Sequence, residues 1–403
     1  MKENEARFTD ITAWTLTAFL YASVFIFGTY SWGRYMLFII SAAIFALSVV
    51  RNGRKAFYAP RPWHYCIIAI TLFSLASSLW AIAPSDSFQK ATTIGVIGVC
   101  FSLPYSYYCR HKDGVRMLVD AVKWGGYAVA VYAFFYYGFG TVFSNLIAAK
   151  RLENGFCNVN SLGMLAAMSV VIGIYEIKLK KKFTADVVMA IPALIMVMTT
   201  QSRKALILLA VGIFAVLILP NGEGKSLRKT LIKALIVAAA LVVVGVLLLQ
   251  LPALGGVKFR IGTLIDALLG RGEDGSSAVE RIEMIKLGLN SFLHHPIAGI
   301  GIGCTHILVA AELAVDTYTH CNYTELLAGG GIIGFAVFYS MYGYLLTMFI
   351  RKRRVAEPMK NLCIIITLLL LIMDVALVSY YSKDLYFMLM IPFLEVERLK
   401  NAE

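Results

Sequence analysis

The chain has 403 residues, of which 59% are hydrophobic and only 15% are charged, and its formal net charge at pH 7 is +13. A soluble domain of ordinary composition is about half apolar and about a quarter charged, so these values exclude a water-soluble protein. Most basic residues lie in short segments between apolar runs, so the charge indicates membrane orientation and gives no reason to expect nucleic acid as a partner.

A run of roughly 20 apolar residues is long enough to cross a bilayer as a helix. Such runs recur from Ile11 to Leu394. They predict an all-α polytopic membrane protein with about twelve transmembrane helices in a single membrane domain, residues 1–403. In chain order the predicted spans are residues 11–29, 35–50, 64–83, 88–108, 117–138, 160–177, 184–199, 204–220, 232–250, 321–349, 361–380 and 383–395.

The basic residues set the orientation of these spans. With the N-terminus inside, about two thirds of the 37 lysines and arginines fall on the cytoplasmic face. Both termini are then cytoplasmic, and the first span, which lacks a cleavage site, is retained. The cations left on the outer side need another reason. They are Arg34, Lys90, Lys150, Arg151, Arg203, Lys204, Lys258, Arg260, Arg271, Arg281, Lys286 and Lys383.

Two of the outer segments are too long to be simple turns. They cover residues 138–160 and 251–320, and loops of this length usually carry function or structure of their own. Within the second segment, apolar residues at 282, 285, 289, 292 and 293 form one stripe at helical spacing. This pattern predicts an amphipathic helix on or over the membrane core.

The outer end of the tenth span carries a group of polar residues. His320 precedes Asn322, Tyr323 and Glu325 in a segment that is otherwise apolar. On a helix Asn322 and Glu325 would lie about one turn apart. A neutral imidazole can accept the proton of an attacking hydroxyl, so His320 is the candidate general base. A histidine that merely lies at the membrane interface is the alternative.

The segment Thr199-Thr200-Gln201-Ser202-Arg203-Lys204-Ala205 forms a tight outer turn between two spans. Arginine at a helix N-terminus, beside free backbone amides, is suited to a phosphate or pyrophosphate. Arg203 is therefore a candidate ligand of such a group. An ordinary loop charge is the alternative.

The segment from Arg151 to Asn160 is an outer loop rich in amides. Asparagine offers both a donor and an acceptor, so Asn158 and Asn160 are suited to sugar hydroxyls. Asparagine is equally common at turns and helix caps, and Asn160 as the cap of the next span is the alternative.

Glycine, histidine and cysteine patterns give no sign of a cofactor or metal. The run Gly299-Ile300-Gly301-Ile302-Gly303 follows no strand, so it favours close turns over helix ends rather than a nucleotide site. His294, His295 and His306 lack metal-ligand spacing. The outer cysteines could be free thiols or form a disulfide, and free thiols are favoured. These cysteines are Cys157, Cys304 and Cys321.

The order of these motifs resembles the O-antigen ligase and O-antigen or capsular polysaccharide polymerase superfamily. The resemblance rests on the Thr-Gln-Ser-Arg turn, on Arg281 followed by His-Pro-x-x-Gly-x-Gly-x-Gly, and on His-x-Asn-Tyr-x-Glu-Leu-Leu-x-x-x-Gly-x-x-Gly-Phe from His320. Ser78-Leu79-Trp80, before Ala83-Pro84-Ser85-Asp86, and Asn160 are similar too. Cys321 is a departure, because relatives often carry Asn directly after the histidine.

The resemblance implies a GT-C-like membrane glycosyltransferase at the outer face of the cytoplasmic (inner) membrane, with its active site facing the periplasm or cell exterior. Its partners would be an undecaprenyl-pyrophosphate-linked glycan, an acceptor glycan or lipid, and membrane lipids, without cofactor or metal. His320 would be catalytic, and Arg203, Arg281 and, less strongly, Arg151 would bind the donor pyrophosphate. The candidate substrate-binding residues are Asn322, Tyr323, Glu325, Asn158 and Asn160.

Three functions remain open from the sequence, beside a non-catalytic scaffold or lipid-binding membrane protein. A polymerase joins one lipid-linked glycan to another, whereas a ligase transfers it to lipid A-core or another acceptor, and the long-loop motif favours the polymerase slightly. A single displacement with a hydroxyl deprotonated by His320 would be inverting. A secondary transporter is less favoured, because Asp374 is the main ionisable residue deep in a span and no repeated halves are visible.

Overall fold

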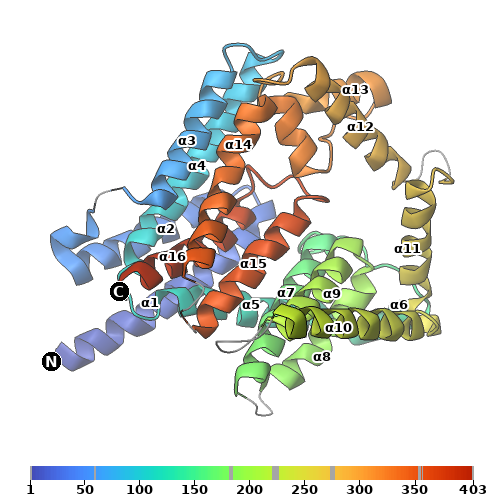
Figure 1. Ribbon diagram of the computed structural model, residues 1–403. Coiled ribbons are helices and arrows are strands. Elements are labelled where there is room, and N and C mark those ends of the chain that lie inside the picture. The colour runs from blue at the N-terminus through green and yellow to red at the C-terminus, as the bar shows by residue number, and fades with distance from the viewer. Residues whose placement is uncertain are drawn as a thin grey trace. The chain divides into compact units, whose positions relative to one another are not determined.

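The computed structural model describes residues 2–58, 60–180, 185–219, 227–272, 277–352, 355 and 357–401, and these residues contain helices and no strand (Figure 1). The prediction of an all-α protein is confirmed. Each predicted span contains a helix. These helices are α1 (Lys2–Phe25), α2 (Gly33–Asn52), α3 (Pro62–Ser77), α4 (Pro84–Tyr108), α5 (Gly114–Tyr137), α7 (Val159–Lys180), α8 (Ala185–Thr200), α9 (Arg203–Ile218), α10 (Leu227–Leu248), α14 (Asn322–Arg351), α15 (Pro358–Met373) and α16 (Lys383–Asn401).

These helices differ in the length of their apolar segment, and two groups can be distinguished. By length and composition, α5, α7, α14 and the segment Gly33–Ala56, which includes α2, are apolar enough to cross a membrane. Four shorter apolar helices lie at Pro62–Ser77, Ala185–Thr200, Ile232–Leu248 and Pro358–Met373. The protein is therefore an integral membrane protein, and the number of twelve spans stays a prediction.

The two long outer segments contain helices of their own. The first holds α6 (Phe139–Ile147) and the second holds α11 (Gly255–Leu268), α12 (Val279–His294) and α13 (Thr305–Leu313). The predicted amphipathic helix corresponds to α12, whose buried residues include Met284, Gly288 and Ser291. Short 3₁₀ helices at Phe27–Thr29, Gly53–Ala56 and Pro252–Leu254 complete the described elements.

Contacts divide the chain into two compact units that alternate along the sequence. Unit 1 comprises residues 1–36, 113–263 and 351–369, and unit 2 comprises residues 37–112, 264–350 and 370–403. Unit 1 therefore holds α1 and α5 to α10, and unit 2 holds α3, α4, α12 to α14 and α16. Helices α2, α11 and α15 contribute residues to both.

In unit 1, α7 is the central helix and packs against α5, α8 and α9 (Figure 1). Small residues make this close packing possible. A Cβ atom on Gly126 would lie 2.0 Å from Oγ of Ser169, and one on Gly212 would lie 2.3 Å from Cγ2 of Val171. These helices can approach so closely only because glycine, which has no side chain, lies at the contacts.

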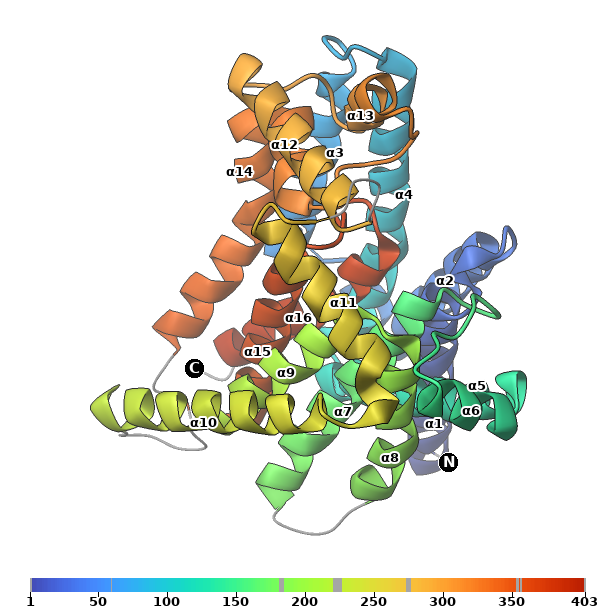
Figure 2. The same cartoon turned by 90° about the vertical axis from the view of Figure 1, so that its right-hand side faces the viewer.

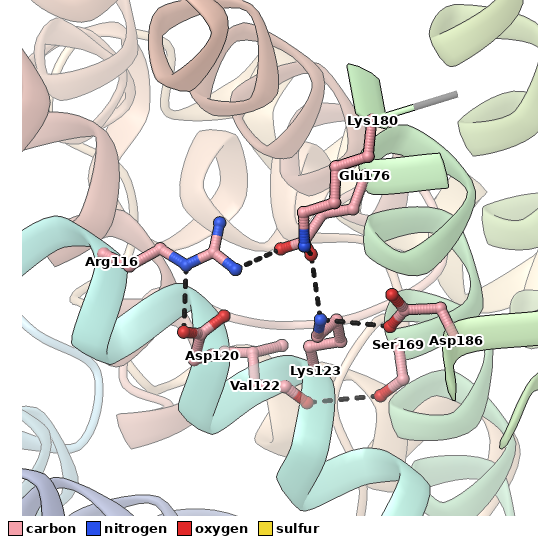
Figure 3. Close-up of polar contacts among 8 residues, drawn as sticks. All are labelled: Arg116, Asp120, Val122, Lys123, Ser169, Glu176, Lys180 and Asp186. Carbon is pink, nitrogen blue, oxygen red and sulfur yellow. Dashed lines mark hydrogen bonds and ion pairs between the residues drawn. The ribbon is translucent and has the colours of Figure 1, made fainter. Parts of the chain in front are cut away.

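Buried charges also join α5, α7 and α8. Nζ of Lys123 lies 3.0 Å from carboxylate oxygens of both Glu176 and Asp186 (Figure 3). Glu176 also pairs with Arg116 at 2.7 Å and with Lys180 at 3.0 Å. The side chain of Lys123 is only 2% exposed, so its charge depends on these carboxylates for compensation.

In unit 2, α3 lies beside α4 in both views, and α16 also packs against α4 (Figures 1 and 2). Aromatic rings fill the contact. Trp63 stacks on Tyr105 with ring centroids 5.7 Å apart and meets Phe393 edge-on at 5.3 Å. These rings lie near the predicted cytoplasmic ends of α3 and α4, so the opposite ends of the two helices are the predicted outer ends.

Helix α14 is interrupted at Gly331, where φ is 60° and ψ is −163°. The break frees backbone groups that a continuous helix would pair. Carbonyl oxygens of Ala328 and Gly329 accept hydrogen bonds from Ile300 N at 3.0 Å and Gly301 N at 2.9 Å. Beyond the break, Ile332 N and Ile333 N donate to carbonyls of Pro296 and Ile297.

The glycine run therefore lies directly against the broken helix. A Cβ atom on Gly299 would lie 2.4 Å from the carbonyl carbon of Gly329, and one on Gly331 would lie 2.3 Å from the carbonyl oxygen of Ile297. The prediction that the run Gly299–Gly303 allows close turns over helix ends is confirmed. Irregular backbone of this kind is tolerated in membrane proteins where other protein groups satisfy it.

The prediction for the eleventh span was wrong at its end. Helix α15 ends at Met373, and residues 374–382 form a non-helical link to α16. The side chain and backbone of Asn322 bond this link, and those bonds replace further turns of helix. Asp374 thus lies in the link and not deep in a span.

Candidate active site

His320 lies in the link between α13 and α14, immediately before Cys321 and the first turn of α14. Its φ is 60°, in the left-handed region that residues with a side chain seldom adopt. The imidazole is half-buried, and the ring of Tyr318 meets it edge-on with centroids 4.5 Å apart. Such a conformation costs about 1–3 kcal/mol and persists only where neighbouring groups impose it.

Glu325 holds the residue that precedes His320. The buried Glu325 carboxylate accepts hydrogen bonds from Thr319 N at 3.0 Å and from Thr319 Oγ1 at 2.9 Å. The hydroxyl of Thr305, at the start of α13, donates to the same carboxylate. Glu325 therefore ties the end of the α13–α14 link to two helices.

Asn322 holds the residues that follow His320. Its Nδ2 donates to the hydroxyl of Tyr339 at 3.1 Å and to Oδ2 of Asp374 at 3.3 Å, while its backbone N donates to Asp374 O at 2.7 Å. Its Oδ1 accepts bonds from Ser379 N at 2.9 Å and Tyr380 N at 3.1 Å. Both ends of this fully buried amide thus have protein partners.

Tyr323 also has partners within unit 2. Its hydroxyl donates to the carbonyl of Leu371 at 2.7 Å, and its ring stacks on Tyr339 with centroids 4.9 Å apart. Asn322, Tyr323 and Glu325 therefore surround the start of α14 as a bracket for His320, and we use "His320 bracket" for these three residues. Asp374 is a further member of this network that the motif did not indicate, because it lies 52 residues from Asn322 in the chain.

Arg281 lies on α12, which packs on the link that carries His320. A Cβ atom on Gly288 would contact Thr319 at 3.1 Å and Thr324 at 3.4 Å, so α12 approaches the link closely at this residue. Arg281 is seven residues before Gly288 and therefore shares its face of the helix, about 10 Å away along the axis. Both views place α12 and α13 next to each other at one end of unit 2 (Figures 1 and 2).

In unit 1, the Thr-Gln-Ser-Arg turn positions Arg203 at the start of α9. Gln201 has a φ of 48°, and its Nε2 donates to Ala149 O at 2.7 Å. Ser202 is the N-cap, because its Oγ accepts a bond from Ala205 N at 3.4 Å. Arg203 is thus the first residue of the helix, as predicted, and its side chain is half-buried.

Arg151 joins this turn to α7. Its Nε donates to Thr200 O at 3.1 Å, and its Nη2 donates to Oδ1 of Asn160 at 2.7 Å. The N-cap of α7 is Asn158, whose Oδ1 accepts a bond from Asn160 N at 2.9 Å. The interpretation of Asn160 as the cap was therefore wrong, because α7 begins at Val159.

The structure thus groups the candidate residues by unit. Unit 2 contains His320, Asn322, Tyr323, Glu325 and Arg281, and unit 1 contains Arg151, Asn158, Asn160 and Arg203. All seven cysteines are free thiols. Across the residues that the structure describes, no three His, Cys, Asp or Glu side chains are grouped as metal ligands would be.

A chain of apolar helices with a half-buried histidine held by buried polar partners has the features of a membrane-embedded enzyme. Residues 188–339 match the family model described as O-Antigen ligase, which confirms the resemblance of the motifs. The matched range includes Arg203, Arg281 and the His320 bracket, whereas Arg151, Asn158 and Asn160 lie before it. No curated protein matches the chain.

The family match and the apolar helices define the protein in general terms. The apolar helices indicate an integral membrane protein, and the matched family supports a membrane glycosyltransferase of the general ligase or polymerase kind. The matched family implies a lipid-linked glycan and an acceptor as substrates in general.

Proposed function

We propose that the protein polymerises undecaprenyl-pyrophosphate-linked oligosaccharide repeat units on the outer face of the cytoplasmic membrane. The observation that carries this proposal is the left-handed conformation of His320 between two residues with buried side chains, Thr319 and Asn322. Backbone strain that the surrounding structure imposes is concentrated at functional sites. An imidazole held in this way has a fixed direction toward a reacting hydroxyl.

In the proposed reaction, His320 accepts the proton of the acceptor hydroxyl while the hydroxyl oxygen attacks the anomeric carbon of the donor sugar. The bond between that carbon and the pyrophosphate oxygen breaks, and undecaprenyl pyrophosphate leaves with the bonding electrons. One displacement at this carbon inverts its configuration.

Arginine is the proposed source of positive charge for the leaving group. We assign pyrophosphate binding to Arg203, to Arg281 and, with weaker support, to Arg151. Planar guanidinium groups bind phosphate oxygens in a bidentate manner and stabilise developing negative charge, so the reaction needs no metal ion. Arg151 also has a positioning role in this proposal, because it bonds the turn that precedes Arg203.

The amides and Glu325 have a more precise role in this proposal than substrate contact alone. Asn322, Tyr323 and Glu325 keep the His320 backbone in place through bonds to buried protein groups. Direct binding of sugar by these residues, and by Asn158 and Asn160, stays a prediction. Oδ1 and Nδ2 of Asn322 and both carboxylate oxygens of Glu325 already bond protein groups, which favours the positioning role.

A ligase is the second candidate function, and the O-Antigen ligase family match favours it. The chemistry at the donor would be the same. The acceptor hydroxyl would belong to lipid A-core or another molecule in place of a second lipid-linked glycan.

The test is an assay of the purified, membrane-reconstituted protein with a lipid-linked oligosaccharide. The proposed polymerase extends the glycan into a ladder without an added acceptor and keeps its activity in a chelator, and the new linkage is inverted by NMR. Transfer only to an added acceptor would support the ligase. His320→Ala is expected to lower turnover by about 10²–10⁴-fold.

His294→Ala is the matched control, because His294 is exposed at the end of α12, where its Nδ1 lies 2.8 Å from the carbonyl oxygen of Asn290. This variant is expected to keep parental turnover. Full activity of folded His320→Ala would contradict the proposal.

A further inference from the structure

Lys90 is an outer-side lysine that the proposed reaction has not yet used. It lies on α4 one turn after Asp86, and its aliphatic stem passes so close to Gly303 that a Cβ atom there would lie 2.3 Å from Lys90 Cγ. Its ammonium nitrogen is 3.6 Å from the centroid of the Tyr381 ring. The stem and the ring thus give the lysine a defined position at the outer end of unit 2.

The ammonium group of Lys90 has N–H donors available for hydrogen bonds. Among the described residues, no hydrogen bond or ion pair joins it to another side chain or carbonyl. A cation–π contact uses one face of the group, whereas an ammonium carries three N–H donors. The half-buried Lys90 therefore has N–H groups available for an anionic ligand.

The neighbouring carboxylates of Asp86 and Glu325 interact with the Lys90 charge only at a distance, because each of them is bonded to another group. Asp86 lies 3.3 Å from Nε2 of His306, and Glu325 accepts the bonds from Thr305 and Thr319. Lys123 in unit 1 shows the contrast, since its ammonium lies 3.0 Å from two carboxylates. A lysine used only to hold helices together is expected to resemble Lys123.

The position of Lys90 is tied to the His320 bracket. Tyr381, which lies under the ammonium group, directly follows Ser379 and Tyr380, whose backbone N–H groups donate to Oδ1 of Asn322. Asn322 is two residues after His320. The same amide therefore fixes both the histidine and the ring that orients the lysine.

We propose that Lys90 binds the pyrophosphate group of the lipid-linked donor, an inference that rests on the proposed function. Lysine is a compact point charge that suits phosphate oxygens, and Tyr381 keeps it extended in the absence of the donor. Lys90 thereby adds a cation from α4 to the pyrophosphate ligands on the outer side. This role also explains why a lysine occurs there against the orientation rule.

Direct binding measurements test this proposal without turnover. The probes are polyprenyl pyrophosphate, polyprenyl monophosphate and phosphatidylglycerol, added to the full-length protein in nanodiscs of neutral lipid. Lys90→Met is expected to weaken polyprenyl pyrophosphate binding about ten- to a hundredfold, and Lys90→Arg to bind within a few-fold of the parent. Lys258→Met, which removes an exposed lysine on α11, is the matched control and is expected to bind as the parent does.

The outcomes separate this inference from the proposed function. Equal binding of polyprenyl pyrophosphate by Lys90→Met and the parent would overturn it, and so would an equal loss for phosphatidylglycerol, which would indicate a general lipid-headgroup site. Unchanged melting of Lys90→Met shows that any loss of binding is local. If the parent transfers no glycan but Lys90→Met still loses pyrophosphate binding, the proposed reaction fails and the Lys90 assignment stands.

Discussion

Replacement of Lys123 by methionine tests the energetic role of the buried charges in unit 1. The substitution keeps the length of the side chain and removes its charge. Lys123, Glu176 and Asp186 have side chains only 2–3% exposed, and both ion pairs measure 3.0 Å (Figure 3). Removal of one partner from a buried pair costs about 3–5 kcal/mol, because the other charge is left in a medium of low polarity.

The partners that remain after the substitution narrow the expected range of destabilisation. Glu176 retains Arg116 at 2.7 Å and Lys180 at 3.0 Å, whereas Asp186 loses its ion pair with Lys123. Because Glu176 stays compensated, the expected decrease in the free energy of unfolding is about 3 kcal/mol, the lower end of this range. The double variant Lys123→Met with Asp186→Asn is expected to recover most of this loss, because both charges are removed together.

Lys180→Met is the matched control within the same network. The Lys180 side chain is 51% exposed and pairs with Glu176 four residues earlier, so its removal is expected to cost about 0.5 kcal/mol or less. The measurement is thermal and denaturant unfolding of the purified protein in one detergent. Equal unfolding of Lys123→Met and Lys180→Met would refute the reasoning, since burial would then make no difference.

Three further predictions concern the active site, the broken helix and a buried thiol. Asn322→Ala is expected to lower turnover on the order of a hundredfold, because His320 loses the bonds that hold its backbone in place. Binding of polyprenyl pyrophosphate is expected to be retained. An unchanged turnover rate would contradict this prediction. Gly331→Ala is expected to destabilise by about 1–3 kcal/mol in unfolding experiments, whereas Gly343→Ala in the open interior of α14 stabilises slightly. Burial raises the pKa of the Cys157 thiol to about 11, so its thiolate fraction at pH 8 is small. Alkylation of Cys157 at pH 8 is therefore expected to be far slower than that of an exposed thiol, and its rate is expected to rise with pH. Rapid labelling of Cys157 in the folded protein would disprove this.

Local sequence patterns were sufficient for the helices. Apolar runs and basic clusters predicted every long helix, because a chain in lipid must satisfy its backbone within each segment. The amphipathic stripe from 282 to 293 likewise predicted α12. The end of α15 at Met373 was missed, because Asp374 and the link after it are held by Asn322, which no window around residue 374 contains.

The candidate site divides in the same way. His320 and Arg203 were predicted from neighbouring residues, since a histidine at a span boundary and an arginine at a helix start are visible in the sequence. The bond from Arg151 to Asn160 and the position of Lys90 over Tyr381 depend on packing between elements. Residue spacing alone gives no information on such contacts.

The sequence by itself determined that this protein is helical and resides in a membrane, because hydropathy, periodicity and charge act over single segments. It also indicated the candidate site residues, whose roles stay a prediction. Only the tertiary structure decided that α14 breaks at Gly331, that Asn322 is fully bonded, and that Lys123 is compensated by carboxylates 53 and 63 residues away. Those features arise where distant backbone and charged groups must satisfy one another in a medium without water.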